Sequence, residues 1–110
     1  MSFDKKYSYE VAKLQAEIIK VLAHPIRIII INYLKKNGPT SVSELTKLFD
    51  VKISSVSKHL KILKDYHIVK DEKKGNYIYY SLTLDCITDF ISCTFEIARN
   101  ITEKNKKILE

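Results

Sequence analysis

The sequence predicts a single, mainly α-helical domain with a small β-hairpin, covering residues 1–110. Three observations predict this class. Apolar residues recur at helical spacing in five separate stretches, whereas two short stretches rich in Ile, Val and Tyr flank a Gly-Asn pair. The length of 110 residues is close to the commonest size of one domain. The expected order is two helices, an optional short strand, two further helices, two strands and a last helix.

The first two helices are expected at about residues 9–23 and 26–36. His24 separates them because the residue before a proline disfavours helical backbone, and Pro25 itself suits the first position of a helix. We therefore expect His24 to have a structural role at this junction. The isoleucines Ile28–Ile31 lie almost all round the second helix, which predicts that this helix is the buried centre of the domain.

A helix–turn–helix is expected next. Ser41 and Glu44 have the S-x-x-E spacing that begins a helix, and this short helix should end near Phe49. Asp50 follows where the chain must turn sharply, and Asp tolerates left-handed backbone better than most residues. A second helix is expected from about residue 53 to 66, and it is the candidate recognition helix.

The candidate recognition helix has two different faces. Its apolar residues repeat at i, i+3, i+7 and i+10 and should face the core: Ile53, Val56, Leu60 and Leu63. Its opposite face carries small hydroxyls and lysines: Ser54, Lys58 and Lys61, with Ser55 and Ser57 flanking. Hydroxyls can reach base edges and ammonium groups can meet phosphates, so this helix suits a DNA major groove. For the lysines alone, the alternative interpretation is a solvated amphipathic helix.

Strands are expected at residues 68–74 and 77–82, because both stretches are rich in residues that favour strands. Gly75-Asn76 between them is typical of a two-residue hairpin turn. The tip of the hairpin, KKGN, is basic and can reach a DNA backbone beside the groove. A helix–turn–helix followed by a basic hairpin is the order of elements in a winged helix.

The last helix is expected from about residue 85 to 106, with Thr83 or Asp85 as its N-cap. Its apolar residues form two stripes, although a surface helix needs only one. The apolar stripe of the first helix is also wider than one neighbour requires. Two stripes imply two partners, so we expect a homodimer that joins through both terminal helices, at about 9–23 and 85–106. The alternative is that both stripes are filled within one chain.

The charge balance favours a polyanionic partner. Nineteen Lys and Arg residues against thirteen Asp and Glu give a net charge of +6.

The sequence shows neither a signal peptide nor an apolar run of the roughly 20 residues that span a bilayer. We therefore expect a cytoplasmic protein without membrane contact, whose cysteines are reduced. No Gly-rich phosphate loop is present and the cysteines have no evident His partner, which argues against an enzyme.

Three segments, VLAHPIRIIIINYL, SVSELTKLF and VKISSVSKHLKILKDYHIVKDEKKGNYIYYSL, resemble the ArsR-type (SmtB/ArsR) bacterial winged-helix repressors. The resemblance covers about residues 19–84. It implies a homodimeric repressor that binds an inverted repeat in double-stranded DNA and is released by an inducer, often a metal ion or a thiol-reactive species. By resemblance, the base-facing positions are Ser54, Ser55, Ser57, Lys58 and His59, with Lys61 near phosphate. The wing contacts fall at Lys73, Lys74, Gly75 and Asn76.

The chain departs from the metal-sensing members of that family. The helix at 43–49 lacks their paired cysteines. The zinc-type site of the last helix is missing, because Ile87 replaces its first histidine. His67 also stands where a glycine usually follows the recognition helix, which leaves the end of that helix undefined by sequence.

Cys86 and Cys93 are the remaining candidates for a sensor. Seven residues apart on one helix face, they are separated by about 10.5 Å, beyond the limit of about 7 Å for a disulfide. Across an antiparallel dimer they could bind a soft ion such as Cd(II), Pb(II), Zn(II) or As(III), or form a bridge under oxidation. The alternative is a structural role as small buried hydrophobes.

Two other functions are compatible with the same sequence. A constitutive winged-helix protein would keep the DNA-binding face and respond to no inducer. A winged-helix interaction module would instead use its apolar surfaces to bind another protein. It would show no salt-sensitive affinity for DNA and no footprint upstream of its own gene.

Overall fold

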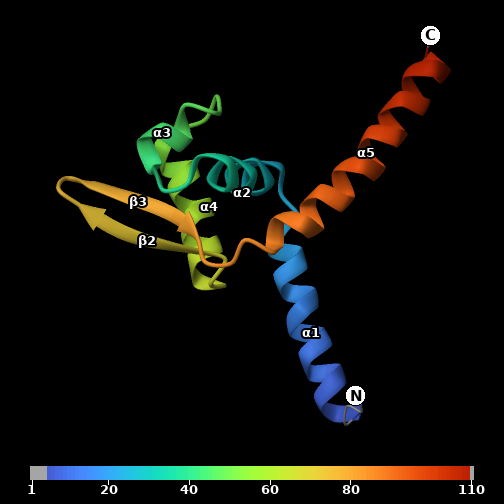
Figure 1. Ribbon diagram of the computed structural model, residues 1–110, viewed down its shortest axis with the longest axis horizontal. Helices are drawn as coiled ribbons and strands as arrows, with labels where there is room; N and C mark the ends of the chain where they lie inside the picture. Colours follow the sequence, from blue (N-terminus) through green and yellow to red (C-terminus); the bar gives the residue numbers. More distant parts are fainter. Residues whose placement is uncertain (1–4, 110) are drawn as a thin grey trace.

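The computed structural model describes residues 5–109 and confirms the mainly α class with a small sheet (Figure 1). Residues 1–4 and 110 of the expected domain lie outside the described part. The elements follow one another in this order: α1 (Lys5–Leu22), α2 (Pro25–Asn37), β1 (Thr40–Ser41), α3 (Val42–Thr46), α4 (Ile53–Asp65), β2 (Val69–Lys74), β3 (Tyr77–Leu82) and α5 (Ile87–Leu109).

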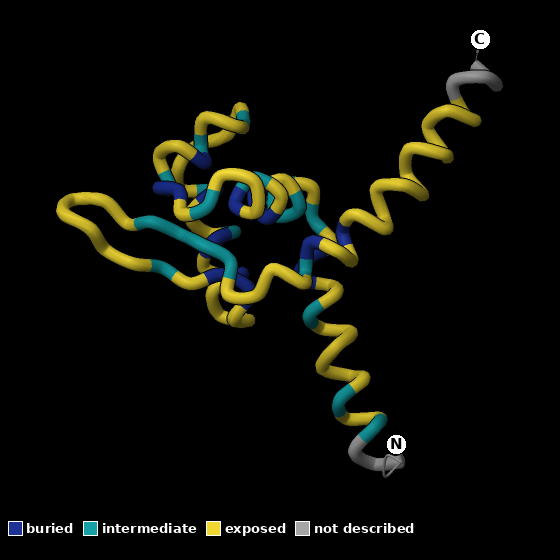
Figure 2. The backbone as a smooth tube through the Cα atoms, in the orientation of Figure 1, coloured by how far each residue is buried: buried dark blue, intermediate teal, exposed yellow. Residues whose placement is uncertain are grey.

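The core lies where α2 and α4 pack against each other, with α3 and the sheet around them (Figure 2). The largest fully buried side chains come from these elements: Ile30, Ile31, Leu45, Val56, Leu60, Leu63 and Val69. Two expectations about the core were wrong. Ile29 of α2 is 45% exposed and Ile53 of α4 is 49% exposed. Both belong to apolar patterns, but no element within residues 5–109 buries their side of the helix.

The end of α4 is closed by a residue in left-handed backbone. His67 has φ 61°, and its amide donates to the carbonyl of Lys64 at 2.9 Å. The amide of Ile68 donates to the carbonyl of Leu63, also at 2.9 Å. This pair of bonds is a Schellman motif, in which glycine is the usual residue at the left-handed position. Among the described residues His67 is the only non-glycine with positive φ, so the expected left-handed Asp50 was wrong.

The sheet is antiparallel, with strand order β1-β3-β2. The hairpin expected from the sequence is confirmed, because Lys74 pairs with Tyr77 across the two-residue turn. Gly75 has φ 61° whereas Asn76 is not among the positive-φ residues, which is the pattern of a type II′ turn. β1 pairs with β3, and its Ser41 also begins α3 by accepting a hydrogen bond from the Glu44 amide at 3.3 Å. The sheet therefore joins the hairpin to the start of the helix–turn–helix.

Helices α1 and α5 project away from this body in different directions (Figures 1 and 2). The Cα radius of gyration, 16.8 Å, exceeds the value of about 13 Å for a compact chain of this length. Buried residues on the two helices lie only near the body, at Val21, Leu22, Thr88 and Ile91. Residues 92–105 of α5 are all exposed. The alternative in which one chain fills both stripes of the last helix was therefore wrong.

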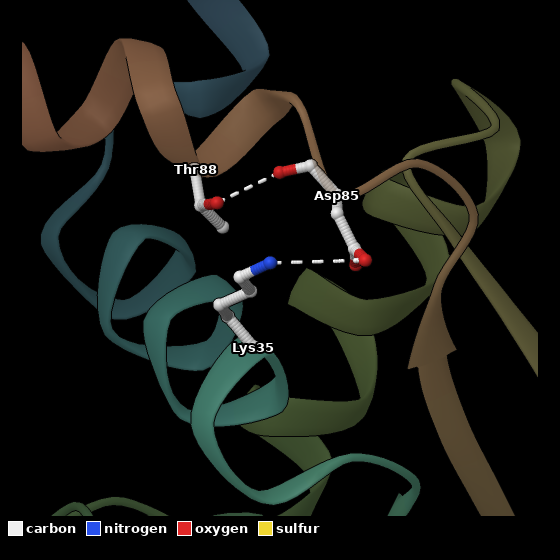
Figure 3. A network of polar contacts seen from close by, with 3 residues as sticks. All are labelled: Lys35, Asp85 and Thr88. Atoms are coloured by element: carbon white, nitrogen blue, oxygen red, sulfur yellow. Dashed lines mark hydrogen bonds and ion pairs between the residues drawn. The ribbon is translucent and has the colours of Figure 1, made fainter.

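The start of α5 is attached to the body through side chains that were expected to cap it. Thr83 instead donates its hydroxyl to the carbonyls of His67 and Ile68. The Asp85 carboxylate lies 3.7 Å from Lys35 Nζ of α2, and the Thr88 hydroxyl donates to the Asp85 carbonyl at 2.7 Å (Figure 3). The expectation that the Thr83 or Asp85 side chain caps the helix was wrong, and α5 begins at Ile87.

Candidate nucleic-acid interface

The outward face of α4 is polar and open to solvent. Ser54, Ser57, Lys58 and Lys61 are exposed, and Ser55 is half-buried at the edge of the face. They lie opposite the fully buried side of the same helix, which anchors α4 to the core. The α4 N-cap, Lys52, makes no side-chain capping bond. The first turn of the helix therefore presents backbone N–H groups and hydroxyls together, the donors that hold phosphates and base edges.

Two lysines of α4 make ion pairs, and the pairs differ in role. Lys61 Nζ lies 3.2 Å from Asp65 Oδ2 one turn along the helix, with both side chains mainly exposed. Such a surface pair contributes about 0.3–0.5 kcal/mol, so it leaves Lys61 free to exchange Asp65 for a phosphate. Lys64 Nζ lies 3.0 Å from Asp71 Oδ2 on β2. Its hydrogen bond to Asp71 raises the pKa of Lys64 and joins α4 to the hairpin.

His59 is turned toward the inside of the chain, unlike the exposed residues of the predicted set. Its Nδ1 accepts a hydrogen bond from Arg27 Nε at 3.0 Å, and its ring centroid lies 4.3 Å from that of His24. Burial, followed by the nearby His24 and Arg27, lowers the pKa of His59. A ring nitrogen that accepts a hydrogen bond carries no proton, so this arrangement holds the imidazole neutral.

The same cluster connects three helices. Arg27 also donates from Nη1 to the carbonyl of Val21 at 2.9 Å, near the end of α1. His24 is the N-cap of α2, and its Nδ1 accepts from the Ile26 amide at 3.1 Å. The expected structural role of His24 at the helix junction is confirmed. Through these bonds the recognition helix is positioned by α1 and α2 together.

The tip of the hairpin provides a second exposed basic surface. Lys73 and Lys74 end β2, and Gly75 and Asn76 form the turn, with all four residues exposed. Figure 1 shows the hairpin extending from the body on the side away from α5. Of the three hairpin tyrosines, Tyr77 is exposed, whereas Tyr79 and Tyr80 are half-buried. The tip is therefore free to meet a polyanion while the base of the hairpin packs on the core.

The cysteines occupy two different environments. Cys86 lies in the turn before α5, whereas Cys93 lies within the helix, so the two do not share one continuous helix as expected. Both thiols are free and exposed, which contradicts burial as small hydrophobes within one chain. Cys86 lines a cavity of about 250 Å³ together with Ile18 of α1, His67 after α4 and Ile87 of α5. Within residues 5–109, no group of three or more His, Cys, Asp or Glu side chains is placed to hold a metal ion.

Comparison with known proteins decides the family. Residues 24–71 match the model described as bacterial regulatory protein, arsR family. The transcriptional repressor SdpR of Bacillus subtilis is 33% identical over 75 residues, which are 68% of this chain and 82% of SdpR. The chain belongs to the ArsR family. This ArsR-family member is accordingly a DNA-binding transcriptional regulator, and the winged helix–turn–helix expected from sequence is confirmed.

Other relatives of this ArsR-family chain agree. The arsenical resistance operon repressor of B. subtilis is 38% identical over 73 residues, which are 66% of this chain and 70% of that protein. The crystal structure of NolR from Sinorhizobium fredii has a TM-score of 0.75 at 26% identity and covers 88% of this chain and 96% of NolR. A homodimeric winged helix-turn-helix DNA-binding domain from Mycobacterium bovis has a TM-score of 0.76 at 19% identity. The match covers 94% of this chain and 95% of that domain. At that identity the likeness shows the fold alone.

Sequence reasoning did not find three features of the candidate interface. Arg27 binds His59 from a position 32 residues earlier, Thr83 fastens the end of α4, and Ile53 faces outward rather than inward. No local pattern could reveal the first two, because their partners are distant in sequence. Ile53 had a usable signal, since it lies at the edge of the apolar stripe on the first turn.

No helix within the described residues is long and apolar enough to cross a membrane.

Proposed function

We propose that this ArsR-family regulator acts as a homodimeric repressor that binds an inverted-repeat operator with its two α4 helices. The outward face of α4 carries the proposal: exposed hydroxyls and lysines lie opposite a fully buried side. A helix held in this way can enter a major groove without disturbing the core. Two such helices related by a twofold axis would meet successive grooves about 34 Å apart.

The terminal helices support the dimer. Both project from the body and carry large apolar side chains that the described residues 5–109 leave about half or more exposed: Tyr9, Leu14 and Ile19 on α1, and Phe90, Phe95, Ile97 and Ile101 on α5. A monomeric domain rarely leaves such a large apolar surface in water. A second copy that packs its own α1 and α5 on these faces would remove that surface from solvent and fix the spacing of the α4 helices.

We assign the DNA contacts to the exposed face of α4, with Ser55 at its edge, and to the hairpin tip. The hydroxyls of Ser54, Ser55 and Ser57 and the ammonium group of Lys58 would meet base edges, and Lys61 would meet phosphate. The hairpin tip from Lys73 to Asn76 would meet the backbone beside the groove. His59 is left out of the base-contacting set, because its half-buried ring packs beside His24 and its Nδ1 accepts a hydrogen bond from Arg27. The proposed role of His59 is to position α4.

A gel-shift titration on the DNA upstream of the chain's own gene tests this function. Binding should be saturable, should compete poorly with unrelated DNA, and should weaken as salt rises, since lysine contacts release condensed counterions. A footprint with two half-sites about one helical turn apart is the expected pattern. A footprint with a single site would contradict the dimeric arrangement. The absence of both a footprint and salt-sensitive DNA binding would instead favour the interaction module.

Cys86 and its cavity support a second step, in which an inducer releases the DNA. The cavity lies where α1, α5 and the end of α4 come together, so a change at Cys86 would act on the dimer helices and on the recognition helix at once. A soft metal ion, As(III) or a thiol-reactive species suits an exposed thiol. The same gel shift, repeated with each agent on wild type and on the Cys86→Ser/Cys93→Ser variant, separates an inducible repressor from a constitutive one.

Two further assignments follow from the family rather than from geometry. We infer that the chain is a regulator and not an enzyme, because the family to which it belongs is one of transcriptional regulators. We also infer that it acts in the cytoplasm, where DNA is accessible and the two free thiols remain reduced.

A further inference from the structure

The turn between α3 and α4 carries an unusual share of exposed apolar side chains. Within six residues, Leu48 is 38% exposed, Val51 is 40% exposed and Ile53 is 49% exposed. One exposed isoleucine needs no explanation, but three large aliphatic side chains in so short a stretch form a surface that water solvates poorly. The stretch that holds these three residues directly precedes Ser54, the first residue of the polar face of α4.

Ile53 is the member placed to meet DNA. It is the first residue of α4, directly before Ser54. Ile53 and Ser57 are one helical turn apart, so their side chains share one side of the helix. In helix–turn–helix proteins the N-terminal residues of the recognition helix contact base edges. An α4 that enters the groove with its first turn leading brings the exposed Ile53 side chain there together with Ser57.

We propose that Ile53 is a specificity-determining residue that packs on the 5-methyl group of a thymine in each half-site. The inference rests on the proposed function, in which α4 enters the major groove. Thymine is the base that presents an apolar group there, and apolar side chains are its natural contacts. Covering a methyl group with Ile53 removes apolar surface from water on both partners. A hydroxyl or a lysine at this position would gain nothing from the methyl group.

The size of the effect follows from the area removed from water. Burial of one methyl-sized group changes an equilibrium by about fourfold, which corresponds to about 0.8 kcal/mol. The expected penalty for losing the methyl group is therefore about fourfold in affinity for each half-site changed. This effect is small compared with the contribution of the lysines, but it is confined to one base pair in each half-site.

The experiment removes the methyl group from the DNA and the side chain from the protein. The full wild-type chain first selects binding sites from random duplex DNA. Each thymine of the selected site is then replaced singly by uracil, which pairs identically but lacks the 5-methyl group. For at least one thymine in each half-site, wild type should lose about fourfold in affinity, whereas Ile53→Ala should bind the thymine and uracil duplexes equally.

The ratio of the two affinities is the readout, so a general loss of binding or folding does not imitate the effect. Ile29→Ala is the matched control, because Ile29 is an isoleucine of similar exposure on α2. It should keep the wild-type thymine preference. If Ile53→Ala binds too weakly to titrate, Ile53→Val takes its place and should show a smaller uracil penalty than wild type.

Each other outcome has a definite meaning. If wild type binds a selected site but no uracil substitution weakens it, or if Ile53→Ala keeps the full penalty, Ile53 does not read thymine and the inference is overturned while the proposed function stands. If wild type selects no sequence from the random pool, the proposed function itself is overturned, and the inference with it.

Discussion

Arg27 Nε donates a hydrogen bond to Nδ1 of His59 over 3.0 Å, and this bond joins α2 to the recognition helix. The same guanidinium donates to the carbonyl of Val21 at 2.9 Å. A single side chain thus fixes α4 relative to the end of α1, from which the proposed dimer interface begins. A movement of α1 or α2 would therefore change the position of the proposed DNA-binding face.

Replacing Arg27 with alanine should destabilise the fold by about 1–2 kcal/mol, because His59 and the Val21 carbonyl lose a charged donor at a partly buried site. Urea unfolding followed by circular dichroism measures the change. Arg99→Ala is the control: Arg99 pairs with Glu96 at 2.9 Å on an exposed part of α5, and its loss should cost less than about 0.5 kcal/mol. Equal effects of the two substitutions would show that the Arg27 bonds contribute little.

Burial, followed by His24 and Arg27, lowers the pKa of His59 below the ordinary histidine value of 6.5. The stability of the fold should therefore fall as the solution is acidified below pH 6.5. A lowered pKa means that the unfolded chain binds the proton more readily, so each step below pH 6.5 favours unfolding. Urea midpoints at neutral pH and near pH 5.5 give the slope. His59→Gln, which removes the titrating ring but retains an acceptor, should flatten it. An unchanged slope would show that His59 is not the group responsible.

His67→Gly should stabilise the chain by about 1 kcal/mol, because left-handed backbone has a steric cost for a non-glycine residue. Thermal unfolding should show a higher midpoint than wild type. Ser57→Gly is the control, since it places glycine in the right-handed interior of α4, where it should lower stability. A destabilised His67→Gly would mean that the His67 side chain makes a compensating interaction in the assembled protein.

The Lys58→Ala/Lys61→Ala variant should bind its operator at least tenfold more weakly. Its affinity should also depend less on salt: the slope of log affinity against log salt concentration should fall by about one unit for each lost lysine–phosphate contact. Fluorescence anisotropy across a range of salt concentrations measures both quantities. Lys13→Ala/Lys104→Ala removes the same charge from the projecting helices and should leave the slope close to wild type. If both variants lose affinity equally, binding depends on net charge and not on the α4 face.

Phe95→Glu should dissociate the dimer, because it places a charge among the apolar residues that α5 exposes in the single chain. Analytical ultracentrifugation should find single chains, and operator affinity should fall with the dimer. Asn100→Glu changes charge equally at another exposed position of α5 and should remain dimeric. A dimeric Phe95→Glu would place the interface elsewhere.

Several features could be predicted from local sequence because local physics controls them. The break at His24-Pro25, the Ser41 cap and the two-residue turn at Gly75 depend on backbone preferences that act over a few residues. The two faces of α4 were also predictable, since Val56, Leu60 and Leu63 repeat at helical spacing and all three are fully buried. Periodicity of this kind determines which residues share a face.

The sequence by itself thus determined the order of the elements, the faces of the recognition helix and the family. Only the tertiary structure decided which faces are covered. It turned His59 toward Arg27, left Ile53 exposed, and used Thr83 to fasten α4 rather than to begin α5. The physical reason is that burial and long-range hydrogen bonds depend on where other helices lie, and a repeat along one helix carries no information about its neighbours.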